Sequence, residues 1–373
     1  MSCFSLKARD GKARAGLIKT LHGDIPTPIF MPVGTRGTVK SLWQEELREL
    51  GAHIVLANTY HLYLRPGHEL VEEVAGGLHG FMNWPRPLLT DSGGFQIFSL
   101  AHLNRVTEKG VEFRSHIDGS LHFIDPEKSM EIQRALGSDI VMMFDDCPRL
   151  PASRESLRQS LELTLNWAKR CAAIPLKEHQ HLFGIVQGGL ELDLRLECLE
   201  RLEALEPSPA GLALGGLSVG EKNHEMRALL EDLAHRLPPH KPRYLMGVGT
   251  PTDILHAISC GVDMFDCVLP TRNARNGQAL TSQGPLNIKN ERFAKDPGPL
   301  DPQCPCKVCT RYSRAYIRHL TTVGEYLAGQ MLSHHNLFFY LDLVGRARKA
   351  ITCGEFDEFA KNFYNTYTQG KVG

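Results

Sequence analysis

Short runs of aliphatic and β-branched residues recur through the chain, and each ends in a polar or glycine-rich turn. Eight such runs occupy residues 28–33, 53–58, 87–91, 139–145, 182–187, 210–216, 244–249 and 262–266. Their continuous apolar character is typical of strands buried on both faces, as in a parallel sheet covered by helices. The sequence therefore has to supply helices between them.

The segments between the apolar runs carry helix start and stop signals. Asp125 and Pro126 form an N-cap and a first-turn proline, and Gly137 ends the pattern that follows them. Amphipathic helices are also expected at residues 154–173 (after Ser153), 191–205, 221–237 and 252–258. Eight alternations of strand and helix predict an α/β fold, a (β/α)8 TIM barrel. The alternative, a doubly wound open sheet, would more usually carry GxGxxG after its first strand, and residues 30–37 lack it.

Composition limits the class of protein. The chain is 42% hydrophobic and 23% charged, which is typical of a soluble globular protein. It begins without an apolar signal segment and contains no run of about 18 apolar residues, so we expect a cytoplasmic protein with no membrane partner. Seven of the ten cysteines are scattered, which indicates reduced thiols instead of a disulfide framework.

Positive charge is concentrated in one stretch, although the net charge of the chain is zero. Residues 271–320 hold nine lysines and arginines against three acidic residues, and the remaining chain has 33 against 39. The zero net charge argues against a general nucleic-acid coat protein. The basic stretch is either a solvated face or a local binding surface for a polyanion.

Three cysteines are clustered inside this basic stretch. Cys304, Cys306 and Cys309 form a C-x-C-x2-C pattern, in which three thiolates can share one ion. His334 or His335 could supply the fourth ligand of a tetrahedral site. Four protein ligands leave no open position, so the expected zinc ion is structural. Unrelated buried cysteines are the weaker alternative, because lysine and proline intervene where a core would hold apolar residues.

The domain organisation follows from these patterns. Residues 111–123 alternate in polarity around Asp118 and Gly119, which predicts a β-hairpin inserted after the third strand. The strand-helix alternation ceases after Gly277. We therefore expect a catalytic barrel at residues 1–277, and a zinc-binding subdomain with C-terminal helices that complete the barrel domain at residues 278–373.

Reactive residues follow the predicted strands. The groups are Asp91 with residues 92–96, Asp145 with Asp146 and Cys147, Gln187 with two glycines, Gly215 to Leu217, and Asp266. In a barrel these strand ends meet at one mouth. Two carboxylates there could act as nucleophile and as acid/base, as in retaining glycosyl transfer. Asp145 and Gln187 suit the edge of a nucleobase, and Phe95 and Met246 could sandwich a flat ring. Taken singly, each glycine pair could be only a tight turn, and Gln187 a satisfied core amide.

Asp266 is followed at once by a basic, turn-rich segment. Arg272 and Arg275 are placed there as phosphate contacts would be. A carboxylate beside a polyanion site would repel its ligand, so Asp266 should serve chemistry that a simple RNA-binding protein does not need. The alternative is an aspartate that caps a turn at the end of a strand.

Five motifs, taken in order, resemble those of the queuine tRNA-ribosyltransferases, also called tRNA-guanine transglycosylases. They are Asp-Ser-Gly-Gly-Phe-Gln at 91–96, Phe-Gly-Ile-Val-Gln-Gly-Gly at 183–189, Gly-Gly-Leu-Ser-Val-Gly-Glu at 215–221, Phe-Asp-Cys-Val-Leu-Pro-Thr-Arg at 265–272, and the Cys3His pattern. The similarity runs from about residue 15 to about residue 344. The family fold is a (β/α)8 barrel with a zinc-containing insertion.

This resemblance implies exchange of the wobble guanine of tRNAs for Asp, Asn, His and Tyr without strand cleavage. Asp266 would be the nucleophile that attacks ribose C1′ and leaves a covalent tRNA-enzyme intermediate. Asp91 would be the general acid for the departing base and the general base for the incoming one. The implied substrate-binding residues are Ser92, Gly93, Gly94, Phe95, Asp145, Cys147, Gln187, Gly216, Leu217 and Met246.

The resemblance also implies a tRNA anticodon stem-loop as partner. The implied RNA-binding residues are Gly247, Val248, Gly249, Thr250, Pro251, Thr252, Asp253, Thr271, Arg272, Asn273, Ala274 and Arg275. The implied ligands of one structural Zn²⁺ per chain are Cys304, Cys306, Cys309 and His335, and His334 is one position off the pattern. Relatives form homodimers near the zinc subdomain, so a homodimer is expected.

Two residues resemble the bacterial members of the family. Cys147 and Val219 are typical of enzymes that insert 7-aminomethyl-7-deazaguanine (preQ1), whereas eukaryotic queuine-using subunits tend to have valine and glycine there. Leu212 and Asp146 depart from the family pattern, which usually has an aromatic residue and glutamate at these positions. A roomier pocket would admit queuine, so a queuine-inserting salvage enzyme is the alternative.

The sequence argues against two further classes of function. A non-catalytic tRNA-binding subunit of the same family would lack the active-site aspartates, and this chain has both Asp91 and Asp266. A barrel glycosidase that acts on free sugars has no use for the basic stretch at residues 271–320.

Overall fold

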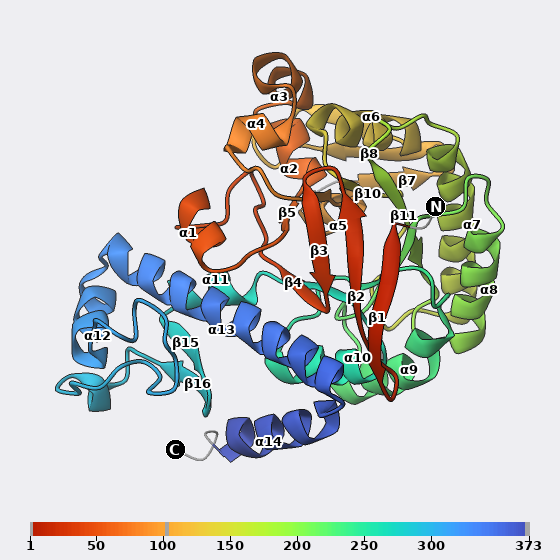
Figure 1. The fold of residues 1–373 in the computed structure, drawn as a ribbon. Coiled ribbons are helices and arrows are strands. Elements are labelled where there is room, and N and C mark those ends of the chain that lie inside the picture. The colour runs from red at the N-terminus through yellow and green to blue at the C-terminus, as the bar shows by residue number, and fades with distance from the viewer. Residues whose placement is uncertain (1–2, 101–103, 370–373) are drawn as a thin grey trace.

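An eight-stranded parallel barrel forms the centre of the computed structural model, which describes residues 3–100 and 104–369 (Figure 1). Its strands are β4 (Ile29–Met31), β5 (Val55–Ala57), β6 (Leu88–Thr90), β10 (Ile140–Met142), β11 (His181–Val186), β12 (Gly211–Leu214), β13 (Arg243–Leu245) and β14 (Met264–Asp266). Each overlaps one of the eight predicted apolar runs. A bridge between Val33 and Leu56 joins the first strand to the second and closes the ring. The predicted (β/α)8 barrel is confirmed.

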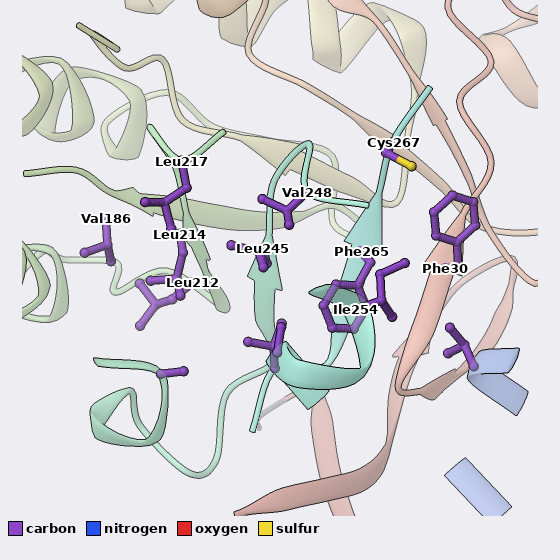
Figure 2. Close-up of a cluster of buried hydrophobic side chains, with 14 of the residues drawn as sticks. Phe30, Val186, Leu212, Leu214, Leu217, Leu245, Val248, Ile254, Phe265 and Cys267 are labelled. Carbon is purple, nitrogen blue, oxygen red and sulfur yellow. The ribbon is translucent and has the colours of Figure 1, made fainter. Parts of the chain in front are cut away.

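Side chains of the barrel strands alternate between two hydrophobic cores. Inward-facing residues such as Leu56, Met142 and Ile185 fill the barrel interior. Outward-facing residues of the same strands pack against the surrounding helices. Figure 2 shows this outer core where Leu245 and Phe265 of neighbouring strands lie near Ile254 of α10. Burial on both faces explains why the strands appear in the sequence as unbroken apolar runs.

Helices cover the outside of the barrel. They are α1 (Gln44–Glu49), α2 (Thr59–Leu64), α3 (His68–Ala75), α4 (Leu78–Met82), α5 (Gly94–Leu100), α6 (Pro126–Leu136), α7 (Arg154–Ala172), α8 (Leu192–Glu203), α9 (Asn223–Leu233) with a 3-10 turn at Ala234–Arg236, and α10 (Pro251–Ser259). Helices α6 to α10 begin within two residues of where the sequence analysis expects them, whereas α1 to α5 were not predicted. Asp125 caps α6 by accepting a hydrogen bond from the Lys128 N–H at 2.7 Å, and Ser153 caps α7 in the same way. Gly137 ends α6 in the left-handed conformation, as predicted.

An antiparallel sheet that the sequence analysis did not predict closes the amino end of the barrel. It consists of β1 (Phe4–Asp10), β2 (Ala13–Thr20) and β3 (Gly23–Thr27), and it lies in front of the barrel in Figure 1. Arg14 forms a buried ion pair with Asp263 at 3.0 Å, and His22 Nδ1 lies 2.8 Å from Asp139 Oδ1. Asp263 and Asp139 each stand just before a barrel strand, so the sheet covers the ends where strands begin.

The predicted hairpin is present, with one strand more than expected. β8 (Gly110–Arg114) pairs with β9 (Leu121–Ile124), and β7 (Asn104–Thr107) adds to the other edge of β8. This three-stranded sheet follows α5 and is therefore inserted after the third barrel strand, β6. Its strands alternate between buried and exposed residues, which is why β8 and β9 could be predicted.

The segment after Asp266 is helical, which corrects the expected turn. Pro270 stands in the first turn of α11 (Leu269–Arg275), where proline favours a helix start. The remaining elements are β15 (Gln278–Thr281), β16 (Gly284–Asn287), a 3-10 turn at Glu291–Phe293, α12 (Arg314–Val323), α13 (Tyr326–Cys353) and α14 (Phe356–Gln369). α13 runs from the β15–β16 region to the barrel (Figure 1), where Tyr340 packs against Phe30 with ring centroids 4.7 Å apart.

Among residues 3–100 and 104–369, no helix combines the length and the apolar character needed to cross a membrane.

Candidate active site

A cavity of about 330 Å³ lies at the carboxyl ends of the barrel strands. Each of the eight strands contributes a lining residue at its end or just beyond it: Val33, Asn58, Asp91, Asp145, Gln187, Gly216, Met246 and Asp266. The barrel therefore brings together the reactive residues that the sequence spreads over more than 170 positions, from Asp91 to Asp266.

Asp91 follows β6 and is buried at the cavity wall. Its carboxylate accepts hydrogen bonds from the Asn58 side-chain amide, from the Thr59 N–H at 2.9 Å and from Gln96 Nε2 at 2.8 Å. Burial and, to a smaller extent, the nearby charge of Asp266 raise the pKa of Asp91 to about 6 against the opposing effect of these donors. A carboxyl group with this pKa can both give and take a proton near neutral pH.

Asp266 is the last residue of β14, and its carboxylate is held in one orientation. Oδ1 accepts hydrogen bonds from the Tyr244 hydroxyl at 2.6 Å and from the Gly247 N–H at 2.7 Å. Oδ2 accepts none from the described residues. Burial raises the pKa of Asp266, although both donors oppose that effect. The site thus combines a fixed carboxylate with one oxygen free for bonding to a ligand.

Asp145 forms the polar end of the cavity together with Gln187. It accepts hydrogen bonds from Gln187 Nε2 at 2.8 Å and from the Ser92 hydroxyl at 3.2 Å, and burial raises its pKa to about 6. Within the described chain, the buried Oε1 of Gln187 has no hydrogen-bond partner. Gly216 has a φ of +63°, which favours glycine, and a Cβ there would lie 2.4 Å from that oxygen and displace the Gln187 amide. A buried polar group without a partner beside a cavity indicates a ligand with polar atoms of its own.

Apolar side chains form the walls. Phe95, which is half exposed on α5, and Met246 both line the cavity, together with Cys147 and Val219. Leu212 does not, because it faces outward into the helix-packed core. Asp146 is also absent from the lining, and its backbone carbonyl accepts hydrogen bonds from helix α7. These two departures from the family pattern therefore do not enlarge the cavity directly.

The expected RNA-binding residues divide into exposed and buried ones. Arg272 and Arg275 are exposed on α11, whereas Thr271 and Ala274 of the same helix are buried. Val248, in the loop between β13 and α10, and Asp253, in the first turn of α10, are also buried, and Asp253 accepts hydrogen bonds from Arg227. A macromolecule could therefore reach only part of the set through side chains.

Two basic residues that sequence reasoning missed extend this surface. Arg36 and Lys40 are exposed in the segment after β4. Partial burial lowers the pKa of Lys40, and the positive charges of Arg275 and Arg36 lower it further, so the three side chains share one electrostatic environment. Their distance in sequence from residues 271–320 hid this relation.

Three residues that contribute to the cavity were not singled out by the sequence analysis, and the sequence marks them to different degrees. Asn58 is the polar residue that ends a predicted strand, so the pattern that singled out Asp91 also applied to it. Tyr244, in contrast, lies within an apolar run and gave no sign that its hydroxyl would reach Asp266. Gln96 ends the motif at residues 91–96, but the resemblance implies no role for it.

The clustered cysteines meet one histidine in a geometry that fits a metal. Cys304, Cys306, Cys309 and His335 place their ligand atoms within 4.8 Å of one another. His335 Nδ1 lies 3.6, 3.6 and 3.3 Å from the three sulfur atoms, and a tetrahedral zinc site separates sulfur from nitrogen by roughly 3.5 Å. His335 Nε2 lies 2.8 Å from the Leu280 carbonyl, which leaves Nδ1 for the ion. His334 lies outside this group.

A second histidine group does not suit a metal. His22, His79 and Asp139 lie within 4.8 Å of one another at the amino end of the barrel. The two imidazole rings are stacked, with centroids 3.5 Å apart and planes 19° apart, so their in-plane lone pairs cannot converge on one ion. Each ring instead contacts one oxygen of Asp139, and the arrangement ties the β2–β3 turn to α4.

Comparisons with known proteins agree over nearly the whole chain. The family model described as "Queuine tRNA-ribosyltransferase" matches residues 10–369. A protein of that name from Fusobacterium nucleatum subsp. nucleatum is 54% identical over 369 residues, which cover 99% of this chain and 98% of the relative. Proteins of the same name from Thermoanaerobacter sp. (strain X514) and Thermodesulfovibrio yellowstonii are 55% and 53% identical, covering 95% and 96% of this chain and 94% of each relative. The similarity includes both the barrel and the Cys3His region.

Proposed function

The chain belongs to the queuine tRNA-ribosyltransferase family, and on that premise we propose that it exchanges the wobble guanine of tRNAs for Asp, Asn, His and Tyr for preQ1. It is a tRNA-guanine transglycosylase, an enzyme of queuosine biosynthesis that acts on tRNA. One observation above all supports the finer proposal. Two carboxylates, the buried Asp91 and the half-buried Asp266, line one cavity, and the charge of Asp266 raises the pKa of Asp91.

Recognition of guanine follows from the polarity of the cavity end. The Watson–Crick edge of guanine offers two donors, N1–H and the exocyclic amine, next to one acceptor, O6. Asp145 is a buried acceptor that suits the donors. The N–H of Gly216, which borders Gln187, suits O6, and the backbone of Leu217 completes this edge. Phe95 and Met246 then flank the ring faces.

The first chemical step uses Asp266 as the nucleophile. Its free carboxylate oxygen forms a bond to ribose C1′ while the bond between C1′ and N9 breaks, and the electron pair leaves with guanine. Asp91 in its acid form donates a proton to the departing base. Tyr244 and Gly247 hold the other oxygen of Asp266, so the attacking oxygen is already oriented.

The second step reverses the first with a new base. N9 of preQ1 loses its proton to the ionised Asp91 and attacks C1′, which displaces the Asp266 carboxylate and restores the enzyme. One group can serve as acid and then as base because its pKa, about 6, lies near neutral pH. No strand of the tRNA is cut in either step.

The tRNA has to present its wobble nucleotide outside the base stack. C1′ cannot be reached within a stacked loop, so the nucleotide is turned out and its flanking phosphates need cations. Arg272 and Arg275 are exposed on α11, which begins three residues after Asp266. The carboxylate and the arginines thus act on different parts of one substrate, the anticodon stem-loop.

Replacing Asp266 by Asn tests the mechanism. Asp266→Asn keeps the size of the side chain but removes the anionic nucleophile, so base exchange and the covalent tRNA complex on a denaturing gel should both disappear. Persistent exchange in a folded variant would refute the assignment of the nucleophile. Absence of exchange in the wild-type protein would instead favour the alternative of a non-catalytic tRNA-binding subunit, in which both aspartates are dispensable.

The choice of preQ1 rests on Cys147 and Val219, which line the cavity and match the bacterial pattern. Queuine carries a bulky cyclopentenediol group, and Leu212 cannot make room for it because it faces away from the cavity. Release of labelled guanine from tRNA should be faster with preQ1 than with queuine. Much faster exchange with queuine would overturn this choice.

The alternative of a barrel glycosidase that acts on free sugars is tested by the salt dependence of tRNA binding. A tRNA-binding enzyme should lose affinity for tRNA steeply as salt rises, and absence of this dependence would favour the glycosidase.

The metal is proposed to be one structural Zn²⁺ per chain. The three thiolates and the imidazole of His335 would complete a four-coordinate site, which offers no open position for water or substrate. The ion would stabilise the segment between α11 and α13, where Cys306 and Cys309 are buried in a separate small core.

A homodimer is also proposed, as in related enzymes. Trp43 and Tyr326 are 70% and 95% exposed and border one shallow pocket between the α1 region and the start of α13. Exposed aromatic residues of this kind are enriched at protein interfaces. Light scattering should give twice the chain mass for the wild type and a shift toward monomer for Tyr326→Glu. A wild-type monomer would contradict the proposal.

A further inference from the structure

Arg195 is a fully buried arginine directly behind the cavity. It lies in the first turn of α8, where the helix dipole disfavours a cation. Its guanidinium donates three hydrogen bonds, all to backbone carbonyls: Nε to Gly189 at 2.7 Å, Nη1 to Val186 at 2.9 Å and Nη2 to Gly215 at 2.9 Å. Among the described residues, no carboxylate lies within ion-pair distance of it.

The three carbonyls belong to two strand ends that form the polar part of the cavity. Val186 and Gly189 flank Gln187 at the end of β11, and Gly215 stands just beyond β12. Gly188 allows this approach, since a Cβ there would lie 2.9 Å from the side chain of Arg195. One guanidinium therefore ties together the two turns that carry Gln187 and Gly216.

The bond to Gly215 has an electronic consequence. The carbonyl of Gly215 and the N–H of Gly216 belong to the same peptide group. A charged donor on the carbonyl oxygen polarises that group and strengthens the N–H as a donor. The N–H of Gly216 has no partner among the described residues and borders the cavity. Burial lowers the pKa of Arg195 only to about 10, so the guanidinium keeps its charge at neutral pH.

We propose that Arg195 is a positioning residue that fixes the Gly215–Gly216 peptide and polarises it, so that the Gly216 N–H recognises the O6 carbonyl of the purine. This proposal rests on the proposed function, which places guanine in the cavity with O6 toward Gly216. The charge acts through one peptide group and never touches the substrate. It selects bases with a carbonyl at this position, where negative charge also grows as the C1′–N9 bond breaks.

The test compares two bases in wild-type and variant enzymes. Guanine and 2-aminopurine differ in the 6-carbonyl group and in the N1–H that accompanies it, so the ratio of their inhibition constants against labelled guanine exchange measures recognition of this edge of the base. Asp145, which would accept from N1–H, is unchanged in the Arg195 variants, so the change in the ratio from wild type to variant reports on O6. Arg195→Lys keeps a charge but can reach fewer carbonyls, and Arg195→Gln removes the charge. We expect the guanine preference to fall about tenfold in Arg195→Gln, with a smaller loss in Arg195→Lys, while binding of 2-aminopurine changes little.

Arg243→Lys is the matched control. Arg243 is also buried and also donates to two carbonyls, those of Gly261 and Leu237, but it lies at the amino end of β13, away from the cavity. Its replacement should lower the melting temperature and leave the guanine preference intact. A general loss of structure would weaken both bases equally in any of these variants.

The outcomes separate the two proposals. If wild-type enzyme does not prefer guanine to 2-aminopurine, the proposed orientation of the base is wrong. If wild-type enzyme prefers guanine and both folded Arg195 variants keep the same ratio, the role of Arg195 is wrong. If Arg195→Gln does not fold, the ratio of the two inhibition constants in Arg195→Lys decides. A folded variant that loses the hydrogen bond to Gly215 should lose part of the preference for guanine over 2-aminopurine.

Discussion

Replacing Asn58 by Leu should move the proton chemistry of the cavity to higher pH. Asn58 donates a hydrogen bond to Asp91, which lowers the pKa of that carboxyl group against the larger effect of burial. Leucine has nearly the same size, so it removes the donor without leaving room for water. The ionised form of Asp91 then loses one of its three donors, and the acid form is favoured.

The size of the effect can be worked out from the hydrogen bond. A bond to a charged group contributes about 1.5–3 kcal/mol, and 1.36 kcal/mol corresponds to one pKa unit. The pKa of Asp91 should therefore rise from about 6 to between about 7 and 8. Guanine release needs the acid form of Asp91, so the rate of the variant relative to wild type should increase roughly 10- to 100-fold between pH 5.5 and pH 9.

Single-turnover release of labelled guanine from tRNA measures this step alone. In the ratio of the variant rate to the wild-type rate, the effects of other groups that titrate in both enzymes, including Asp145, cancel. Thr90→Val is the control, because the Thr90 hydroxyl bonds to Gln133 and Ser138 behind the cavity and never to Asp91. Its ratio should be flat with pH. A flat ratio for Asn58→Leu as well would refute the role of Asp91 as the acid.

Three other perturbations test separate parts of the molecule. Cys306→Ala should lose the single zinc ion and lower the melting temperature together, whereas Cys353→Ala, at an exposed free cysteine, should do neither; a metal-free but fully stable wild type would contradict the site. Arg275→Ala should weaken tRNA binding and reduce the slope of log affinity against log salt by roughly 0.7 to 1, and an unchanged slope would exclude a phosphate contact. Asp145→Asn tests how the charge of Asp145 changes stability with pH. The pKa of Asp145 in the folded protein, about 6, lies above its value in the unfolded chain. The contribution of Asp145 to stability is therefore fully present below the unfolded pKa and is lost as the pH rises through 6. The free energy of unfolding of Asp145→Asn, relative to that of wild type, should be roughly 1 kcal/mol higher at pH 8 than at pH 5. The same difference at both pH values would argue against the raised pKa.

Sequence patterns predicted the barrel well because its strands are buried on both faces. Runs such as residues 139–145 have no polar side that could be confused with a surface strand, and Asp125, Gly137 and Ser153 mark the helix boundaries. The amino-terminal sheet escaped notice because β1 is mostly half exposed and carries few apolar residues in sequence. Helix α11 escaped because its isolated sequence favours turns, and it is held by packing against α13.

The active site was predictable only where chemistry and strand ends coincide. Asp91, Asp145, Gln187 and Asp266 each end an apolar run, and a barrel gathers such positions at one mouth. Side chains that act on these residues from other positions do not end apolar runs, so the sequence pattern did not single them out. The hydroxyl of Tyr244 comes from within a strand, and the guanidinium of Arg195 comes from a helix. Their roles depend on distances of about 3 Å that periodicity does not encode.

The closure of the barrel has a consequence for how the chain folds. Ile29 of the first barrel strand pairs with Met264 of the last, and Arg14 meets Asp263 across 249 positions. Arg348 of α13 then donates to the Pro26 carbonyl, 322 positions away. Contacts of such long range form late, because loop closure precedes any gain from pairing. On the ribosome, one edge of β4 stays unpaired until β14, which ends at Asp266, has emerged, so this stage is where the nascent protein most needs protection from aggregation.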